Sequence, residues 1–360
     1  MDVEQAVRAR VASGEVHGAA WLVDRGGSVT SGVAGTVRPD SIFRISSVTK
    51  PVVGALAMAL IDDGALGLDD AVDEWLPELA DRSVLRDPQG PLEDTVPAER
   101  PITVRDVLEF RLGIGMDFAG PFPGAVLGAL AERGLAVGPP APQQSPPPDE
   151  WMRVLGGVPL SAQPGARWLY NTSAQVLGVL LARAAGTPLP ELLTERLLGP
   201  LGMTDTGFHV PADKLARFGA HWLGGVYDEV DGQWARPPAF PDAGGGLVST
   251  VADLHAFATM LRSRGATVLT PQSVTAMTSA HVGAHDPDGR EGWGLGIGVF
   301  LADAPDGRHA GAYGWDGGLG QTWWTDPVSD TVAILLTTDA WTSPQPTPVF
   351  TEFWQAAFGG

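Results

Sequence analysis

The residues in this sequence best suited to chemistry are a serine and a lysine three positions apart. Ser47 and Lys50 stand at the start of an apolar segment, residues 48–63, which we predict to form a buried helix ended by Gly64. Residues three apart share a helix face, so the lysine amine lies within reach of the serine hydroxyl. A buried lysine can hold a neutral amine near pH 7 and accept the serine proton, and the helix N-terminus favours the negative charge that results.

Lysine is rare in this chain. Of the 23 lysine and arginine residues, only Lys50 and Lys214 are lysines. Arginine stays protonated in proteins, whereas a buried lysine can be neutral and act as a base, so a lysine in such a chain raises the question of what arginine could not do at that position. The pair therefore favours a lysine-activated serine nucleophile. The alternative is a helix-capping serine beside a lysine whose amine reaches solvent.

Two further segments carry residues that could assist a serine nucleophile. Tyr170 is one of only three tyrosines and directly precedes an apolar helix predicted over residues 173–185, so it is a candidate proton carrier. The alternative is a tyrosine anchored in the core. Residues 313–320, YGWDGGLG, precede a predicted strand at 321–326, and their glycines allow a backbone N–H to approach a substrate oxygen. The alternative is a glycine-rich turn.

Other chemistries find little support. The absence of cysteine excludes disulfides, thiolate metal ligands and a thiol nucleophile. His281 and His285 have the spacing of metal ligands on a helix, but glycine and proline around them favour a loop, so we predict no metal and no cofactor. Asp286–Gly289 lacks the register of a calcium loop. No Gly-x-Ser-x-Gly motif is present to favour a Ser-His-Asp triad, and His309 is expected at the surface or beside the pocket.

Composition and charge narrow the class of protein. The chain has 360 residues, 44% of them hydrophobic, and a formal net charge of −19. This composition excludes a mainly disordered chain, and the negative charge disfavours nucleic acid and anionic membranes as partners. No stretch approaches the ~20 apolar residues of a membrane span. The first ten residues, MDVEQAVRAR, lack the apolar segment of a secretory signal, so we expect a cytoplasmic protein. Its oligomeric state is left open.

The order of predicted elements is strands, a long helical middle, and strands again. A helix at residues 3–12 precedes strands at 19–24 and 29–34, and strands at 292–301, 321–326 and 331–337 precede a closing helix at 348–358. We therefore expect a discontinuous α/β sheet domain, residues 1–60 and 240–360, and a mainly helical domain, residues 61–239, with the active site at their junction. A proline-rich loop at 138–149 is either a surface connection or the rim of a pocket.

These segments together resemble a known superfamily. Residues 43–50, FRISSVTK, resemble the Ser-x-x-Lys region of serine β-lactamases and penicillin-binding proteins, and more closely that of the class C β-lactamase-like esterases called family VIII carboxylesterases. Residues 64–70, 102–108, 200–203 and 245–250 and Asp253 fit the same pattern in order. The resemblance implies a β-lactamase/transpeptidase-like fold, of the α/β plus all-α class, with a central antiparallel sheet flanked by helices and an inserted helical lobe.

The resemblance also implies roles for individual residues. Ser47 would be the acylated nucleophile, Lys50 its activating partner and Tyr170 the second proton carrier. The oxyanion hole would be the backbone N–H groups of Ser47 and Gly318. The predicted substrate-binding residues are Asn171, Trp315, Asp316 and Gly317.

Two departures from the family pattern bear on the substrate. The asparagine of a Tyr-x-Asn motif stands directly after the tyrosine, as Asn171, which re-aims its side chain. Trp315 replaces the cation that holds a substrate carboxylate in lactamases and D,D-peptidases, which favours neutral esters over anionic β-lactams or peptide C-termini. Four tryptophans are candidates for an apolar acyl pocket: Trp151, Trp168, Trp315 and Trp323.

The prediction is therefore a serine carboxylesterase that acts on a small-molecule ester through an acyl-Ser47 intermediate, with acyl transfer to an alcohol as a second outcome. One alternative is a β-lactamase, D-amino-acid peptidase or D,D-peptidase on the same scaffold. Another is a non-catalytic binding protein of the same fold.

Overall fold

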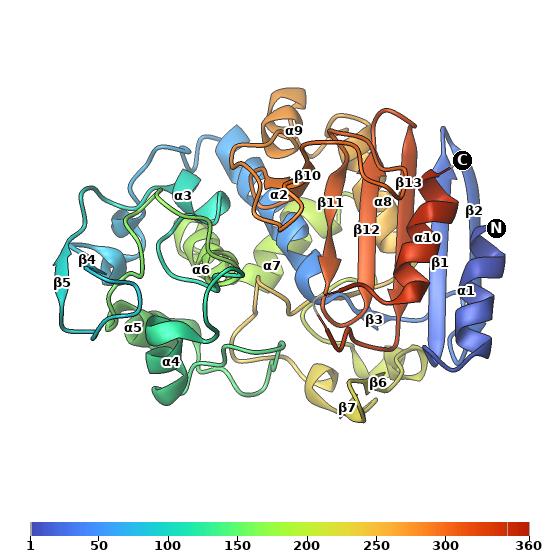
Figure 1. Ribbon diagram of the computed structural model, residues 1–360, viewed down its shortest axis with the longest axis horizontal. Coiled ribbons are helices and arrows are strands. Elements are labelled where there is room, and N and C mark those ends of the chain that lie inside the picture. Colours follow the sequence, from blue (N-terminus) through green and yellow to red (C-terminus); the bar gives the residue numbers. More distant parts are fainter. Residues whose placement is uncertain (1, 344, 360) are drawn as a thin grey trace.

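A seven-stranded antiparallel sheet forms one half of the computed structural model, which describes residues 2–343 and 345–359 (Figure 1). The strand order is β2-β1-β13-β12-β11-β10-β9, so strands from the two ends of the chain pair directly, with Ala19 opposite Thr337. The strands are β1 (Gly18–Arg25), β2 (Ser28–Gly35), β9 (Glu291–Trp293), β10 (Gly298–Phe300), β11 (Tyr313–Gly317), β12 (Gln321–Asp326) and β13 (Thr331–Thr337).

Helices cover both faces of this sheet, so its inner strands such as β12 and β13 are buried on both sides, whereas the edge strand β2 is mostly exposed. The terminal helices α1 (Val3–Ala12) and α10 (Pro348–Phe358) lie side by side on one face (Figure 1). Their apolar side chains share a core cluster with Trp324 and Leu335 of the sheet. The other face packs against α8 (Val251–Arg262), where Phe257 meets Trp323 edge to face. Alternate residues of a strand therefore serve two separate cores.

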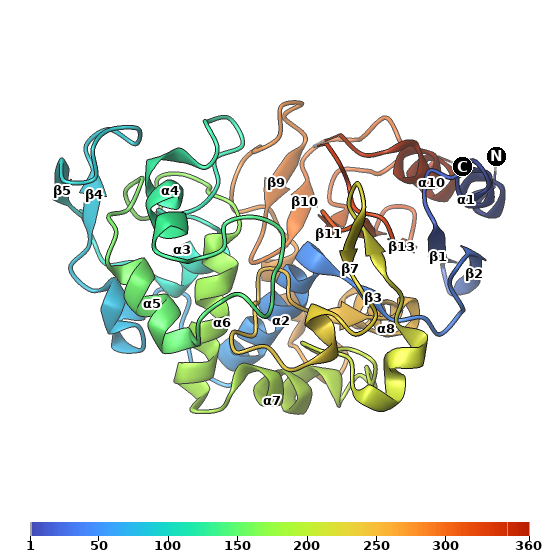
Figure 2. The ribbon, with the colours of Figure 1, turned by 90° about the horizontal axis from the view of Figure 1, so that it is seen from below.

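The second half of the molecule is mainly helical and is joined to the sheet by a central helix. This helix, α2 (Thr49–Asp62), lies between α6 and the sheet, and nearly all of its residues are buried (Figure 2). The other helices are α3 (Val104–Leu108), α4 (Gly124–Glu132), α5 (Pro148–Gly156), α6 (Thr172–Ala185), α7 (Leu189–Leu193) and α9 (Pro271–Met277). Three two-stranded ladders complete the described elements: β3 (Phe43–Arg44) with β8 (Val248–Ser249), β4 (Ser83–Leu85) with β5 (Thr95–Pro97), and β6 (His221–Trp222) with β7 (Val226–Asp228).

The structure confirms the predicted fold class and refines two of its elements. The strand expected at residues 292–301 is two short strands, β9 and β10, because the intervening segment turns at Gly296, whose φ is +80°. The proline-rich loop ends where α5 begins. Pro148 occupies the first turn of α5, where no N–H is needed.

The domain boundaries at residues 60 and 240 stay a prediction, and their outermost residues, Met1 and Gly360, lie outside the described part. None of the described helices is by itself long and apolar enough to cross a membrane; the bent pair Thr172–Ala185 and Leu189–Leu198, at 84°, meets the length and composition criteria only together.

Candidate active site

Ser47 and Lys50 lie together at the N-terminal end of α2, as their spacing predicts. Ser47 belongs to a 3₁₀ turn, Ser46–Val48, that leads directly into the helix. The Lys50 side-chain nitrogen, Nζ, lies 2.9 Å from Ser47 Oγ and 2.5 Å from the carbonyl oxygen of Gly244. Lys50 is 1% exposed, whereas Ser47 is half-buried. The lysine is therefore shielded from water while the serine hydroxyl remains accessible.

The backbone at Ser46 fixes the direction of the neighbouring serine. Ser46 has a φ of +39°, a left-handed conformation that a non-glycine residue adopts only when its surroundings hold it there. Its hydroxyl donates to Gln321 Oε1 at 2.9 Å and accepts from the Leu319 N–H at 3.3 Å. Gly317 lies against this turn, and a Cβ there would collide with Ser46 Oγ. Gly317 therefore lets β11 approach the nucleophile rather than contacting a substrate through a side chain.

Tyr170 lies over the lysine, but its hydroxyl faces a different partner. The ring centroid is 4.5 Å from Lys50 Nζ. The Trp315 indole N–H donates to Tyr170 Oη at 2.8 Å, and this is the one hydrogen bond of that hydroxyl to the described residues. Trp315 is held edge-on by Trp293 at a centroid distance of 4.7 Å. The structure thus brings Ser47, Lys50, Tyr170 and Trp315 into one cluster.

Two backbone N–H groups are free to receive a substrate oxygen. Ser47 and Gly318 both line the cavity in front of the serine. Neither N–H donates a hydrogen bond to any other described residue. The Gly318 carbonyl accepts from the Trp341 N–H at 2.9 Å, which fixes the peptide that follows β11. Both residues of the predicted oxyanion hole therefore line the cavity with unpartnered N–H groups among the described residues, and their role stays a prediction.

The remaining predicted substrate-binding residues have different positions. Asn171 lines the cavity and has a φ of +78°, which turns the chain sharply before α6. Asp316 does not reach the cavity, and this corrects its prediction as a substrate contact. It points to the face of the sheet covered by α10, because strand neighbours alternate. There its carboxylate accepts from Thr322 Oγ1 at 2.5 Å and Trp324 Nε1 at 2.9 Å.

The cavity in front of Ser47 has a volume of about 360 Å³. Its walls come mostly from α4, from the chain that follows it and from α5; the apolar lining residues include Met116, Phe122, Leu127, Leu130, Leu135, Val137, Pro139, Pro140 and Trp151. Of the proline-rich loop, Gly138, Pro139 and Pro140 line the cavity, which favours its interpretation as a pocket rim. Of the four candidate tryptophans, only Trp151 lines this cavity, whereas Trp323 packs under α8.

Three site residues lie outside the motifs that the sequence singles out. Gly244 accepts the Lys50 hydrogen bond, and Asp242 and Gln175 line the cavity beside it. Burial raises the pKa of Asp242, against the opposing effects of the Gly244 N–H, Gln175 and the Lys50 charge. The one signal available in the sequence is an acidic residue directly before the run Gly244–Gly246.

The predicted histidine positions carry no catalytic group. His285 stacks on Trp168 at 4.1 Å, and His309 contacts the Asp326 carboxylate at 2.7 Å, away from the cavity. Within residues 2–343 and 345–359, no group of three His, Asp or Glu side chains gathers in a way that could hold a metal ion.

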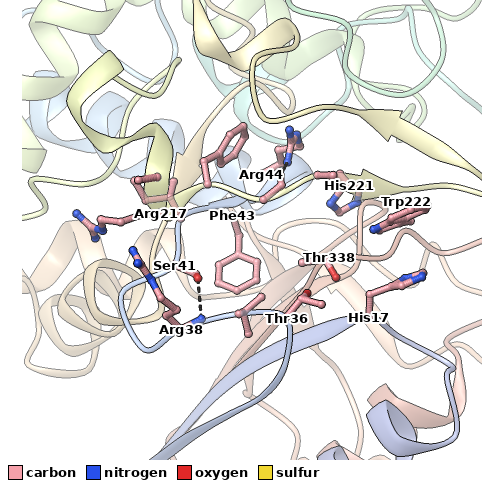
Figure 3. Close-up of a pocket in the computed structure, with 16 residues that line it drawn as sticks. His17, Thr36, Arg38, Ser41, Phe43, Arg44, Arg217, His221, Trp222 and Thr338 are labelled. Carbon is pink, nitrogen blue, oxygen red and sulfur yellow. Dashed lines mark hydrogen bonds between the residues drawn. The ribbon is translucent and has the colours of Figure 1, made fainter.

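A second cavity, of about 270 Å³, lies beside β3 and β6 (Figure 3). Arginine and aromatic side chains surround it, among them Arg44, Arg217 and Trp222. Arg44 is paired with Asp228 at 2.5 Å, and Arg217 with Asp205 at 2.6 Å. Because these cations are already neutralised and none of Ser47, Lys50 and Tyr170 lines the cavity, it is not the reaction site.

The sheet, the central helix and the Ser47–Lys50 pair define the class of serine-dependent enzymes with a β-lactamase/transpeptidase-like fold. The chain belongs to the β-lactamase family, whose profile matches residues 3–347. It is 36% identical over 322 residues to protein Rv1367c of Mycobacterium tuberculosis, with 82% of this chain and 77% of that protein covered. It is 30% identical to esterase EstB of Burkholderia gladioli, with 85% and 79% covered.

Solved structures give the same result for the fold. The hydrolase EstCE1, described as having promiscuous acyltransferase activity, superimposes with a TM-score of 0.82 and 25% identity over 99% of this chain and 97% of that one. Simvastatin synthase LovD of Aspergillus terreus superimposes with a TM-score of 0.76 and 22% identity, over 99% and 96% of the two chains.

Proposed function

We propose that this protein is a serine carboxylesterase that forms an acyl intermediate on Ser47. The observation that carries the proposal is the 2.9 Å contact between Lys50 Nζ and Ser47 Oγ at the mouth of an apolar cavity. The relatives support it, since they include proteins named as an esterase and as a hydrolase with promiscuous acyltransferase activity.

Each catalytic step has a group in position. Lys50 accepts the Ser47 proton while Ser47 Oγ attacks the ester carbonyl. The carbonyl oxygen becomes an oxyanion and is stabilised by the N–H groups of Ser47 and Gly318; such donors contribute about 3–4 kcal/mol in known hydrolases. The proton passes to the leaving alkoxide, with Tyr170 as its second carrier. Water then releases the acid, and an alcohol in its place gives acyl transfer.

The junction of two regions forms the proposed site. Ser47, Lys50 and Gly318 come from residues 1–60 and 240–360, whereas Tyr170 and the apolar wall of α4 come from residues 61–239. The groups that attack the ester and the apolar wall that selects it would thus belong to different regions of the chain.

The cavity favours a neutral ester over an anionic β-lactam. Its lining contains no arginine, lysine or histidine side chain. The Trp315 N–H, which replaces the cation of related enzymes, is already bonded to Tyr170. An anionic substrate would therefore leave water without a compensating positive charge.

Intact-mass spectrometry after treatment with a fluorophosphonate tests the nucleophile. We expect one adduct per chain, mapped to Ser47 by peptide analysis and lost in Ser47→Ala. Absence of an adduct would instead favour a non-catalytic binding protein.

Steady-state assays test the substrate class. We expect kcat/KM for p-nitrophenyl butyrate to exceed that for nitrocefin. Faster nitrocefin turnover would reject the ester preference and favour the lactamase alternative.

A further inference from the structure

The cavity in front of Ser47 is apolar except at one end. Asp242 is the only formally charged side chain among its lining residues. Asn171, Thr172 and Gln175 lie at the same end, on α6 or just before it. An apolar pocket with a few convergent polar groups typically uses them to orient a ligand. The end that contains Asp242 is therefore the part of the cavity able to distinguish one ester from another.

The Asp242 carboxylate is firmly held but incompletely used. Its Oδ1 accepts from the Gly244 N–H at 2.7 Å, and its Oδ2 accepts from Gln175 Nε2 at 3.2 Å. A carboxylate can accept about four hydrogen bonds, so each oxygen retains acceptor capacity. No arginine, lysine or histidine of the described residues forms an ion pair with it. The side chain is half-buried and lines the cavity.

A shielded carboxylate of this kind is better stabilised when a donor approaches it. Burial raises the pKa of Asp242, because the anion is poorly solvated there. A bound hydroxyl would supply a hydrogen bond, and a bound ammonium would supply a hydrogen bond and a charge, so either would offset the lost hydration. A second carboxylate or an alkyl group would not.

A short series of hydrogen bonds links the carboxylate to the reacting atoms. One residue connects the two interactions, because the N–H of Gly244 donates to Asp242 and the carbonyl of Gly244 accepts from Lys50. Lys50 in turn contacts Ser47 Oγ. Because three hydrogen bonds in series connect Asp242 with Ser47, we place the ligand donor a few bonds from the scissile carbonyl rather than at the far end of a long chain.

We propose that Asp242, supported by Gln175, is a specificity-determining residue that selects esters whose acyl group carries a hydroxyl or a protonated amine close to the carbonyl. This inference rests on the proposed esterase function. The inference adds to that function a polar substituent on the acyl group, which the apolar walls alone would disfavour.

The test compares three p-nitrophenyl esters with one carbon skeleton: butyrate, 3-hydroxybutyrate and 3-aminobutyrate, the last two as separate enantiomers. For the wild-type protein we expect kcat/KM to be higher for at least one enantiomer of each substituted ester than for butyrate, with the larger gain for the amine. Hydrogen bonds to charged groups contribute about 1.5–3 kcal/mol, which corresponds to a preference of roughly 10- to 100-fold.

Asp242→Asn keeps an oxygen acceptor for the Gly244 N–H but removes the charge. We expect the amine-to-butyrate ratio to fall about tenfold or more in this variant, as the loss of a charged hydrogen bond predicts. Asp288→Asn removes the same charge from an exposed position and should leave the ratio unchanged.

The inference is overturned if wild-type protein prefers butyrate to every substituted ester, a result that needs no variant to fold. It is equally overturned if folded Asp242→Asn keeps the wild-type ratio. Fluorophosphonate labelling separates these outcomes from failure of the proposed function: labelled Ser47 with no substituent preference rejects only the role of Asp242, whereas unlabelled Ser47 rejects both.

Discussion

Lys50 contacts both the proposed nucleophile and the loop that holds Asp242. Of the site residues, it therefore tolerates the fewest substitutions. Its amine fits between Ser47 Oγ and the Gly244 carbonyl at hydrogen-bonding distances of 2.9 and 2.5 Å. A guanidinium is larger and stays protonated, so it can neither fit this space nor accept a proton.

We predict that Lys50→Arg loses about 100- to 10,000-fold in kcat/KM for p-nitrophenyl butyrate, the usual contribution of a general base. The loss should occur without loss of the folded circular dichroism spectrum. Lys214→Arg is the matched control, because Lys214 contacts Thr204 and Asp205 away from the site. Activity of Lys50→Arg within tenfold of wild type would show that the lysine acts only as a fixed charge.

We expect Trp315 to affect catalysis through its hydrogen bond to Tyr170. Replacing it with phenylalanine keeps an aromatic ring but removes the N–H that donates to Tyr170 Oη at 2.8 Å. We predict a fall in kcat of about 2- to 10-fold, the range expected for one hydrogen bond, with little change in KM. In a double-mutant cycle, Trp315→Phe should add nothing to Tyr170→Phe. Additive losses would mean that Trp315 contacts the substrate directly.

Residue spacing was sufficient to predict some of this site and insufficient for the rest. Ser47 and Lys50 are three apart on one helix, so local geometry alone places them together. Asp316 was misassigned because the motif places it beside Trp315, while strand alternation sends it to the opposite face. Asp242 escaped prediction because its partner Gln175 is 67 residues away in sequence.

At the scale of elements, α4 and the chain after it decide what the cavity admits. Val137 is half-buried in the rim and contributes to the lining. A tryptophan there would occupy part of the volume of about 360 Å³. We predict that Val137→Trp lowers the octanoate-to-acetate ratio of kcat/KM for p-nitrophenyl esters about tenfold, because each excluded methylene forfeits ~0.8 kcal/mol.

The control for this change is Val328→Trp, at a position 66% exposed in the turn between β12 and β13. An unchanged chain-length ratio in Val137→Trp would show that the acyl chain does not enter from this side.

The attachment of α8 to the sheet depends on a buried carboxylate. Asp24 on β1 contacts Arg262 Nη2 at 2.6 Å and His255 Nε2 at 2.9 Å, both on α8. Burial opposes ionisation, but hydrogen bonds from Arg262, His255 and the Gly27 N–H lower the pKa of Asp24 to about 2. A carboxyl whose folded pKa is depressed from 3.8 contributes stability above about pH 4 and loses it as the pH falls toward 2.

We therefore predict that Asp24→Asn lowers the free energy of unfolding by about 2 kcal/mol at pH 7, and by less at pH 3, where wild type has lost part of this contribution. Urea titrations at the two pH values measure both quantities. Asp330→Asn provides the control, because Asp330 approaches the same arginine from an exposed position, at 3.9 Å. An equal difference between wild type and Asp24→Asn at pH 7 and pH 3 would contradict the ionic explanation.

Elements were predictable where a local pattern determines them and not where a tertiary contact does. The continuous apolar stretch at residues 49–62 defines α2 by itself. The start of α5 at Pro148 and the division between β9 and β10 depend on turns that the flanking strands and helices impose. The cavity wall was the least predictable part. The segments that form it, α4 and the chain that follows, carry no motif, and they line the cavity only because the fold places them over Ser47.

The field of the whole molecule bears on which substrates reach the site. The formal net charge is −19, and Asp242 adds a negative group inside the cavity itself. Long-range repulsion acts on encounter and is screened by salt, because the Debye length falls from about 30 Å at 0.01 M to about 3 Å at 1 M ionic strength. Repulsion inside the cavity is screened much less. Salt therefore separates the two contributions.

We predict that kcat/KM for the anionic ester 4-acetoxybenzoate rises about threefold or more between 0.01 and 1 M sodium chloride, relative to its neutral methyl ester, because only the anion experiences the screened field. Even at 1 M salt the neutral ester should remain the better substrate, since the cavity lining offers no cation to a carboxylate. If the ratio of kcat/KM for the two esters did not change with salt, the cavity alone would account for the preference for the neutral ester. If the two esters had equal kcat/KM at high salt, the net charge of the molecule would account for the preference. The lack of a cation in the cavity lining would then not explain it.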